Sequence, residues 1–227
     1  MEQHLEKFEE IIGYSFKKKN LLKTALTHSS YANEQGGDLK YNERLEFLGD
    51  SVLGIITAEY LFKNHKDFPE GELTKVRAAL VCEKALFEFA KQIHLGEFLF
   101  LGKGELHTGG RNRPSILADA FEALIAAIYL DGGMKQAKSF VLRFITTAQE
   151  QAIELNTDYK TKLQEIIQKN PEERIEYATI GETGPDHDKR FIVVVKLNSN
   201  IIGRGEGRSK KQAEQFAARE ALKLMGI

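Results

Sequence analysis

The chain has 227 residues, of which 42% are hydrophobic and 29% are charged, a balance typical of a globular protein with one large core or two modest ones. Lys and Arg number 32 against 33 Asp and Glu, so the net charge of −1 excludes a strongly basic protein that binds nucleic acid through bulk charge. The acidic N-terminus lacks a leader pattern, and no segment approaches the ~18 apolar residues of a membrane span. Cys82 is the single cysteine and cannot form an internal disulfide. We therefore expect a cytoplasmic protein without membrane insertion.

Apolar residues recur at helical spacing through the first two thirds of the chain. The predicted helices run from Leu5 to Ile12, Leu21 to Thr27, Arg44 to Phe62, Leu73 to Ile93, Ile116 to Leu130 and Met134 to Glu154. Glycine-rich or proline-containing breaks separate several of them, as at Phe68-Pro69-Glu70-Gly71. The sequence therefore predicts an all-helical domain at 1–148 and a linker at 149–157.

Acidic residues interrupt two of these predicted helices. They are Glu43, Glu46 and Asp50 in the first, and Asp119 and Glu122 within an otherwise apolar stretch of the second. Residues three, four or seven apart share a helix face, where like charges repel, and a carboxylate among apolar side chains is costly unless it is paired or bound to a metal. Oxygen-only ligands favour Mg²⁺. For the first cluster, a solvated helix start with acids at the positive end of the helix dipole remains an alternative.

The periodicity changes beyond the linker. A helix is predicted from Asp158 to Gln168, strands from Arg174 to Thr179, Arg190 to Leu197 and Asn200 to Gly203, and a final helix from Ser209 to Met225. The β-branched run Ile192 to Val195 favours a strand over a helix. We expect a small α+β domain of order α-β-β-β-α at 158–227.

A local basic patch precedes and begins the last predicted helix. Its members are Arg204, Arg208, Lys210 and Lys211. Ser209 can cap this helix with Gln212 at the capping-box position, and Gly205 and Gly207 let the backbone approach a partner. Exposed amide hydrogens, the helix dipole and two ammonium groups together favour a phosphate. Ordinary solvated lysines at a helix start are the alternative.

Four ordered segments resemble the motifs of the ribonuclease III family of double-stranded-RNA endonucleases. They are Thr27-His28-Ser29-Ser30-Tyr31, Asn42-Glu43-Arg44-Leu45-Glu46-Phe47-Leu48-Gly49-Asp50, Phe68-Pro69-Glu70-Gly71-Glu72-Leu73-Thr74 and Ile116-Leu117-Ala118-Asp119-Ala120-Phe121-Glu122-Ala123-Leu124. Ser51 departs from the alanine that the family more often has. Two later segments, Gly184 to Phe191 and Gly205 to Glu214, resemble the double-stranded-RNA-binding domain. The resemblance implies an all-α ribonuclease III endonuclease domain followed by a small α+β (α-β-β-β-α) double-stranded-RNA-binding domain.

The resemblance also implies roles for the acids. Asp50 and Glu122 would be catalytic, Glu46, Asp119 and Glu122 would ligate Mg²⁺, and Asp50 would ligate directly or through water. Mn²⁺ would substitute for Mg²⁺. Glu43 and Glu70 would steer water or substrate at the edge of the cleft, although both could be surface acids.

Contacts with RNA and with a second subunit are implied in the same way. Gln164 and His187 would each meet a minor groove, and Arg208, Ser209, Lys210 and Lys211 would lie at the major-groove phosphates. Phe47 would insert into the partner of a homodimer, or else pack within its own subunit.

The implied function is Mg²⁺-assisted hydrolysis of both strands of double-stranded RNA, in the processing of ribosomal, messenger and other structured transcripts. Products would carry 5′-phosphate and 3′-hydroxyl ends with short 3′ overhangs. A non-catalytic double-stranded-RNA-binding protein and a metal-dependent phosphohydrolase of small nucleotides are the alternatives.

Overall fold

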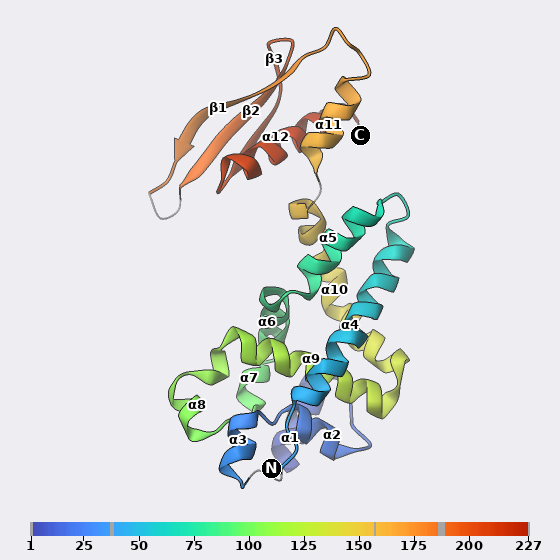
Figure 1. Ribbon diagram of the computed structural model, residues 1–227, viewed down its shortest axis with the longest axis vertical. Coiled ribbons are helices and arrows are strands. Elements are labelled where there is room, and N and C mark those ends of the chain that lie inside the picture. Colours follow the sequence, from blue (N-terminus) through green and yellow to red (C-terminus); the bar gives the residue numbers. More distant parts are fainter. Residues whose placement is uncertain (1, 37–38, 157, 186–188, 227) are drawn as a thin grey trace. The chain divides into compact units, whose positions relative to one another are not determined.

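The computed structural model describes residues 2–36, 39–156, 158–185 and 189–226 (Figure 1). The chain forms two compact units, Met1–Asn156 and Thr157–Ile227, and each has its own hydrophobic core. Among the described residues, no helix combines the length and the apolar character needed to cross a membrane.

The described part of the first unit is built from helices. They are α1 (Glu2–Ile12), α2 (Lys19–Ala25), α3 (Ser29–Glu34), α4 (Glu43–Asn64), α5 (Glu70–Val81), α6 (Glu83–Gln92), α7 (Leu95–Phe98), α8 (Lys103–His107), the 3-10 helix η1 (Gly110–Asn112), α9 (Pro114–Gly132) and α10 (Met134–Asn156). The only β-type pairing described there is a parallel bridge between Thr27 and Phe100. The all-helical prediction for this part of the chain is confirmed.

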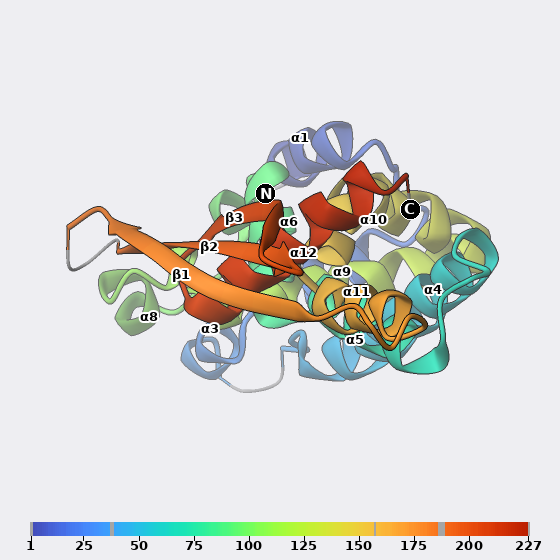
Figure 2. The same ribbon diagram turned by 90° about the horizontal axis from the view of Figure 1, so that it is seen from above.

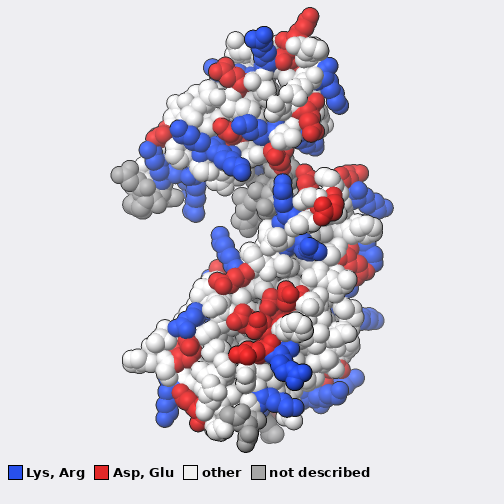
Figure 3. Space-filling view, in the orientation of Figure 1, with Lys and Arg blue, Asp and Glu red and all other residues white. Residues whose placement is uncertain are grey.

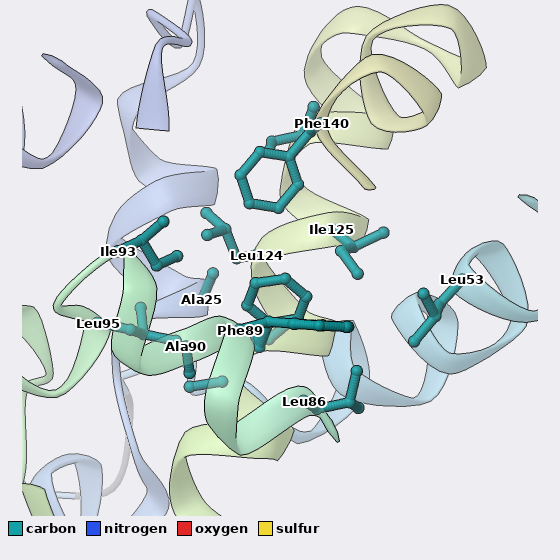
Figure 4. Close-up of a cluster of buried hydrophobic side chains, with 14 of the residues drawn as sticks. Ala25, Leu53, Leu86, Phe89, Ala90, Ile93, Leu95, Leu124, Ile125 and Phe140 are labelled. Carbon is teal, nitrogen blue, oxygen red and sulfur yellow. The ribbon is translucent and has the colours of Figure 1, made fainter. Parts of the chain in front are cut away.

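Helix α9 forms the centre of this unit. It packs against α2, α4, α6 and α10, and side chains from these neighbours converge around it (Figure 4). Leu124 and Ile125 of α9 are fully buried, and Phe121 packs against Phe89, Phe140 and Phe144. The helix that carries Asp119 and Glu122 is therefore held in place by closely packed apolar side chains.

Two boundaries in the first unit differ from the sequence prediction. The single helix expected from Leu73 to Ile93 is divided into α5 and α6, because Cys82 has extended backbone angles (φ −73°, ψ 157°) and serves as the N-cap of α6. Cys82 is exposed. Helix α10 continues to Asn156, through most of the segment expected to be a linker.

The described part of the second unit contains α11 (Tyr159–Ile167), β1 (Ile175–Thr183), β2 (Arg190–Leu197), β3 (Asn200–Gly207) and α12 (Lys210–Leu224). The strands form an antiparallel sheet of order β1-β2-β3, and their ribbons run side by side in Figures 1 and 2. The predicted α-β-β-β-α order is confirmed. Strands β1 and β3 extend four residues past their predicted ends, to Thr183 and Gly207.

Glycines at alternate positions of β3 set the contact between the sheet and α12. A Cβ atom on Gly205 would lie 2.2 Å from the Ala213 carbonyl oxygen, and one on Gly203 would lie 2.3 Å from that of Ala217. These glycines, with Gly207, therefore let the helix backbone rest on the strand. The close approach that the sequence predicts at Gly205 and Gly207 is made here by α12 of the same chain.

Candidate nuclease centre and RNA-binding surface

Helices α4 and α9 pack so closely that their backbones are in contact at Gly49 and Glu122. A Cβ atom on Gly49 would lie 1.9 Å from the carbonyl oxygen of Glu122 and 3.1 Å from its Cα. Only glycine fits there, and it lies directly before Asp50. The close approach therefore brings the acidic face of α4 to the acidic pair on α9.

The predicted acids of the two helices interact electrostatically. Burial, followed by the charges of Asp50, Glu46 and Asp119, raises the pKa of Glu122 to about 8. Burial, followed by Asp119, Glu43 and Asp50, also raises the pKa of Glu46. Figure 3 shows acidic side chains gathered on one face of this unit. Four carboxylates from two sequence segments thus share one neighbourhood, in which full ionisation is unfavourable without a cation.

Asp119 has two further neighbours. Burial is the largest cause that raises its pKa, Glu83 adds to it, and His28 opposes both. Glu83 begins α6 and His28 caps α3, so neither lies on the helices that carry the acidic motifs. Sequence reasoning did not assign either residue to this site, because helical spacing relates only residues of one helix.

The donor set fits a hard divalent cation. All four side chains offer carboxylate oxygens, which Mg²⁺ prefers. A cation would offset the burial and the repulsion that together raise the pKa of Glu122 and Glu46. Within the described ranges, no three His, Cys, Asp or Glu side chains are already arranged as a metal site.

Glu43 and Glu70 differ in their relation to this centre. Glu43 contributes to the raised pKa of Glu46, so it lies beside the cluster. The Glu70 carboxylate accepts a hydrogen bond from the Thr74 hydroxyl at 2.9 Å. It also lines a recess between α4 and α5.

Phe47 projects from α4 into solvent, with 79% of its surface exposed. Ile55 and Phe62, eight and fifteen residues further along α4, are 58% and 72% exposed. At 3.6 residues per turn the three side chains share one face. The alternative that Phe47 packs within its own subunit therefore does not hold.

The second unit presents the predicted basic residues at the start of α12. The Ser209 hydroxyl accepts the Gln212 backbone N–H at 3.2 Å, and Gln212 Oε1 accepts the Arg208 N–H at 2.8 Å. Ser209 is therefore the N-cap. Lys210 and Lys211 are exposed, as is Gln164 on α11.

Arg204 belongs to the basic patch that the sequence predicts, and His187 to the expected RNA contacts. Arg204 alternates along β3 with the glycines that face α12, so its side chain lies on the opposite face of the sheet. Arg204 is therefore not part of one patch with Lys210 and Lys211. His187 lies outside the described residues.

Comparison with known proteins agrees with both units. The Ribonuclease-III-like family matches residues 18–149, and the double-stranded RNA binding motif matches residues 159–225. The chain is 50% identical to Ribonuclease 3 of Caldanaerobacter subterraneus subsp. tengcongensis, over 96% of this chain and 97% of that protein. It is 49% identical to Ribonuclease 3 of Listeria monocytogenes serovar 1/2a, over 96% of both.

A solved structure shares the fold of the first unit. The nuclease domain of ribonuclease III from Campylobacter jejuni superimposes with a TM-score of 0.59 at 46% identity, covering 63% of this chain and 96% of that one. The fold and the acidic helices define a metal-dependent nuclease joined to a double-stranded-RNA-binding domain. The chain belongs to the ribonuclease III family and is a double-stranded-RNA endoribonuclease.

Proposed function

We propose that the protein hydrolyses both strands of double-stranded RNA at the centre formed by α4 and α9, with Mg²⁺ as the metal and Mn²⁺ as a substitute. The observation that supports this most directly is the mutual pKa elevation among carboxylates of two helices in backbone contact. The products carry 5′-phosphate and 3′-hydroxyl ends with short 3′ overhangs. The substrates are ribosomal, messenger and other structured transcripts in the cytoplasm.

Glu46, Asp119 and Glu122 would hold the metal, with Asp50 ligating it directly or through water. The bound cation supplies Lewis acidity, which lowers the pKa of a coordinated water and screens the phosphate charge. Asp50 accepts a hydrogen bond from the attacking water and orients it. Glu122, whose pKa of about 8 lies close to neutral pH, holds or releases a proton at its carboxylate as the site fills. Glu43 and Glu70 steer water and substrate at the edge of the cleft.

Recognition belongs to the second unit in this proposal. Lys210 and Lys211 contact phosphates across the major groove, and the exposed N-terminus of α12, with Arg208 and Ser209, adds donors. Gln164 and His187 contact minor grooves and their 2′-hydroxyls. Such contacts read the shape of the duplex and not its sequence. The functional division would be nuclease residues 1–148, connecting residues 149–157 and RNA-binding residues 158–227.

A homodimer would place one centre on each strand. The exposed face formed by Phe47, Ile55 and Phe62 supports this, because single chains rarely leave three large apolar side chains together in water. A cavity of about 560 Å³ beside this helix is lined in part by Leu21, Leu48 and Leu130. It could receive an aromatic ring from a second copy.

An RNA duplex incubated with the full chain tests the proposal. Fragments in Mg²⁺, and a mobility shift without fragments in EDTA, are the expected results. A shift under both conditions would indicate the non-catalytic alternative. Hydrolysis of free nucleotides with an intact duplex would indicate the small-molecule phosphohydrolase.

A further inference from the structure

Glu182 is an acidic side chain at the end of the sheet where α12 begins. It pairs directly with Phe191 across β1 and β2, and Phe191 pairs with Gly207 across β2 and β3. Directly opposite residues of a sheet point to the same face, and a Cβ atom on Gly207 would lie 2.7 Å from the backbone nitrogen of Ala213 in α12. Glu182 therefore lies on the face of the sheet that α12 covers.

Two lysines lie beside the Phe191 ring on this face. The Nζ atoms of Lys189 and Lys210 are each 5.9 Å from the centroid of the ring, and Lys189 Nζ is 2.5 Å from the Glu182 carboxylate. The hydrogen bond from Lys189 is the largest cause that lowers the pKa of Glu182, and the charges of Lys189 and Lys210 lower it further. One carboxylate and two ammonium groups thus share the surface at the start of α12.

The position of Glu182 has a consequence for RNA, because Lys210 belongs to the proposed phosphate-binding surface. A carboxylate beside that surface repels phosphates, and it also occupies the ammonium group of Lys189. The side chains of Lys189 and Glu182 are 43% and 42% exposed, so an RNA strand can approach both. The carboxylate therefore stands where a phosphate of the duplex would bind.

We propose that Glu182 limits the affinity of the second unit for double-stranded RNA, by pairing with Lys189 and by repelling phosphates at Lys210. The inference rests on the proposed duplex binding by this unit and concerns its strength. In the wild-type complex Lys189 stays with the carboxylate and makes no phosphate contact. Removal of the carboxylate frees Lys189 for one additional phosphate.

Glu206 offers a matched control on the other face of the sheet. It lies between Gly205 and Gly207 of β3, which face α12, so its side chain points away from that helix. Its carboxylate lies 3.5 Å from Arg190 Nη1. Glu206→Gln therefore removes the same charge and also frees one basic side chain, but on the face away from Lys210.

The experiment is a filter-binding titration of the full chain with an RNA duplex in EDTA, over a range of salt concentrations. We expect Glu182→Gln to bind roughly two- to fivefold more tightly at low salt, the scale of one exposed ion pair. Its slope of log affinity against log salt should be steeper by about one unit, because Lys189 gains a phosphate. Glu206→Gln should keep the wild-type slope. Equal gains in the two variants would show that only net charge acts, and would overturn the proposal.

The double variant Glu182→Gln with Lys189→Met tests whether the freed lysine is responsible. Methionine keeps most of the side-chain length without the charge, so the slope should return to the wild-type value. A slope that stays steep would overturn the proposal.

Glu182→Thr provides a second test if Glu182→Gln does not fold, because threonine favours a strand. Its slope should also be steeper than that of the wild type, and an unchanged slope would contradict the proposal. Failure of the proposed duplex binding would look different. In that case the wild-type chain itself would not retain the RNA duplex at any salt concentration.

Discussion

Glu122 is the residue at which the electrostatic cost of the centre is greatest. Its pKa is raised from 4.5 to about 8, first by burial and then by three neighbouring acids. A carboxyl group whose folded-state pKa lies above its unfolded value stabilises the fold fully below the unfolded pKa. This stability is lost as the pH rises through the folded pKa. For Glu122 the loss falls between about pH 4.5 and pH 8.

Replacing Glu122 with Gln should remove this dependence, because the amide has no charge to suppress. In metal-free protein we expect the melting temperature of the variant to exceed that of the wild type at pH 8.5 by roughly 3 °C or more, equivalent to about 1 kcal/mol for a chain of this size. The gap should close at pH 5. The measurement is thermal unfolding of both proteins, followed by circular dichroism across this pH range. If the two melting temperatures change with pH in parallel, the pKa of Glu122 is not raised in the folded protein.

Helix packing decides whether these acids meet, and Gly49 is the position that allows it. Gly49→Ala would drive a Cβ atom into the Glu122 backbone, which cannot rotate away as a side chain can. We expect a loss of more than about 3 kcal/mol in the free energy of unfolding, above the usual 1–3 kcal/mol for overpacking.

Gly54→Ala, in the middle of the same helix α4, is the matched control for Gly49→Ala. Its added Cβ meets nothing within 4 Å, so helix propensity alone should stabilise it by about 0.5–1 kcal/mol. Denaturant unfolding of the two variants gives both values. A neutral Gly49→Ala variant would contradict the backbone contact between α4 and α9.

Close backbone packing also joins β3 to α12 in the second unit. Gly205→Ala should displace α12, because its Cβ would lie 2.2 Å and 2.3 Å from the backbone of Ala213 and Ala217. We expect loss of duplex binding and of amide-exchange protection in residues 159–226. Gly181→Ala on β1, with an ordinary 3.7 Å contact to Ile192, should retain both, and equal behaviour of the two variants would refute this packing.

Sequence periodicity predicted the long elements well, because their buried faces repeat over several turns. Both acidic helices and the strand from Arg190 to Leu197 lie where expected. The break at Cys82 was missed because it carries no Gly or Pro signal, and the short helices α3, α7 and α8 have too few turns to show a period.

The site was predictable only in part. Helical spacing and family resemblance selected the four central acids and Glu43. The neighbours Glu83 and His28 come from other elements, and only tertiary packing brings them to Asp119. The glycines of β3 were also understood only in part. The sequence predicts that another backbone comes close to them, but it does not show that this backbone is α12.

At the scale of the whole molecule, duplex binding should depend on the lysines that begin α12. Replacing Lys210 and Lys211 with Ala should weaken binding and reduce the slope of log affinity against log salt by roughly one unit per lost phosphate contact. Lys223→Ala, at the other end of the same helix, is the control and should leave the slope intact. A filter-binding titration from low to moderate salt distinguishes them, and an unchanged slope would remove both lysines from the interface.

The central claim is that carboxylates from α4 and α9 form one metal-dependent nuclease centre. Single-turnover cleavage of a long RNA duplex by the full chain, wild type against Glu122→Gln, tests it most directly. In Mg²⁺ we expect the variant to lose on the order of 10³-fold in rate, the scale of losing one group that stabilises transition-state charge. Duplex affinity in Ca²⁺ should stay within about twofold, because binding resides in phosphate contacts elsewhere. A folded variant that cleaves at the wild-type rate would contradict the account.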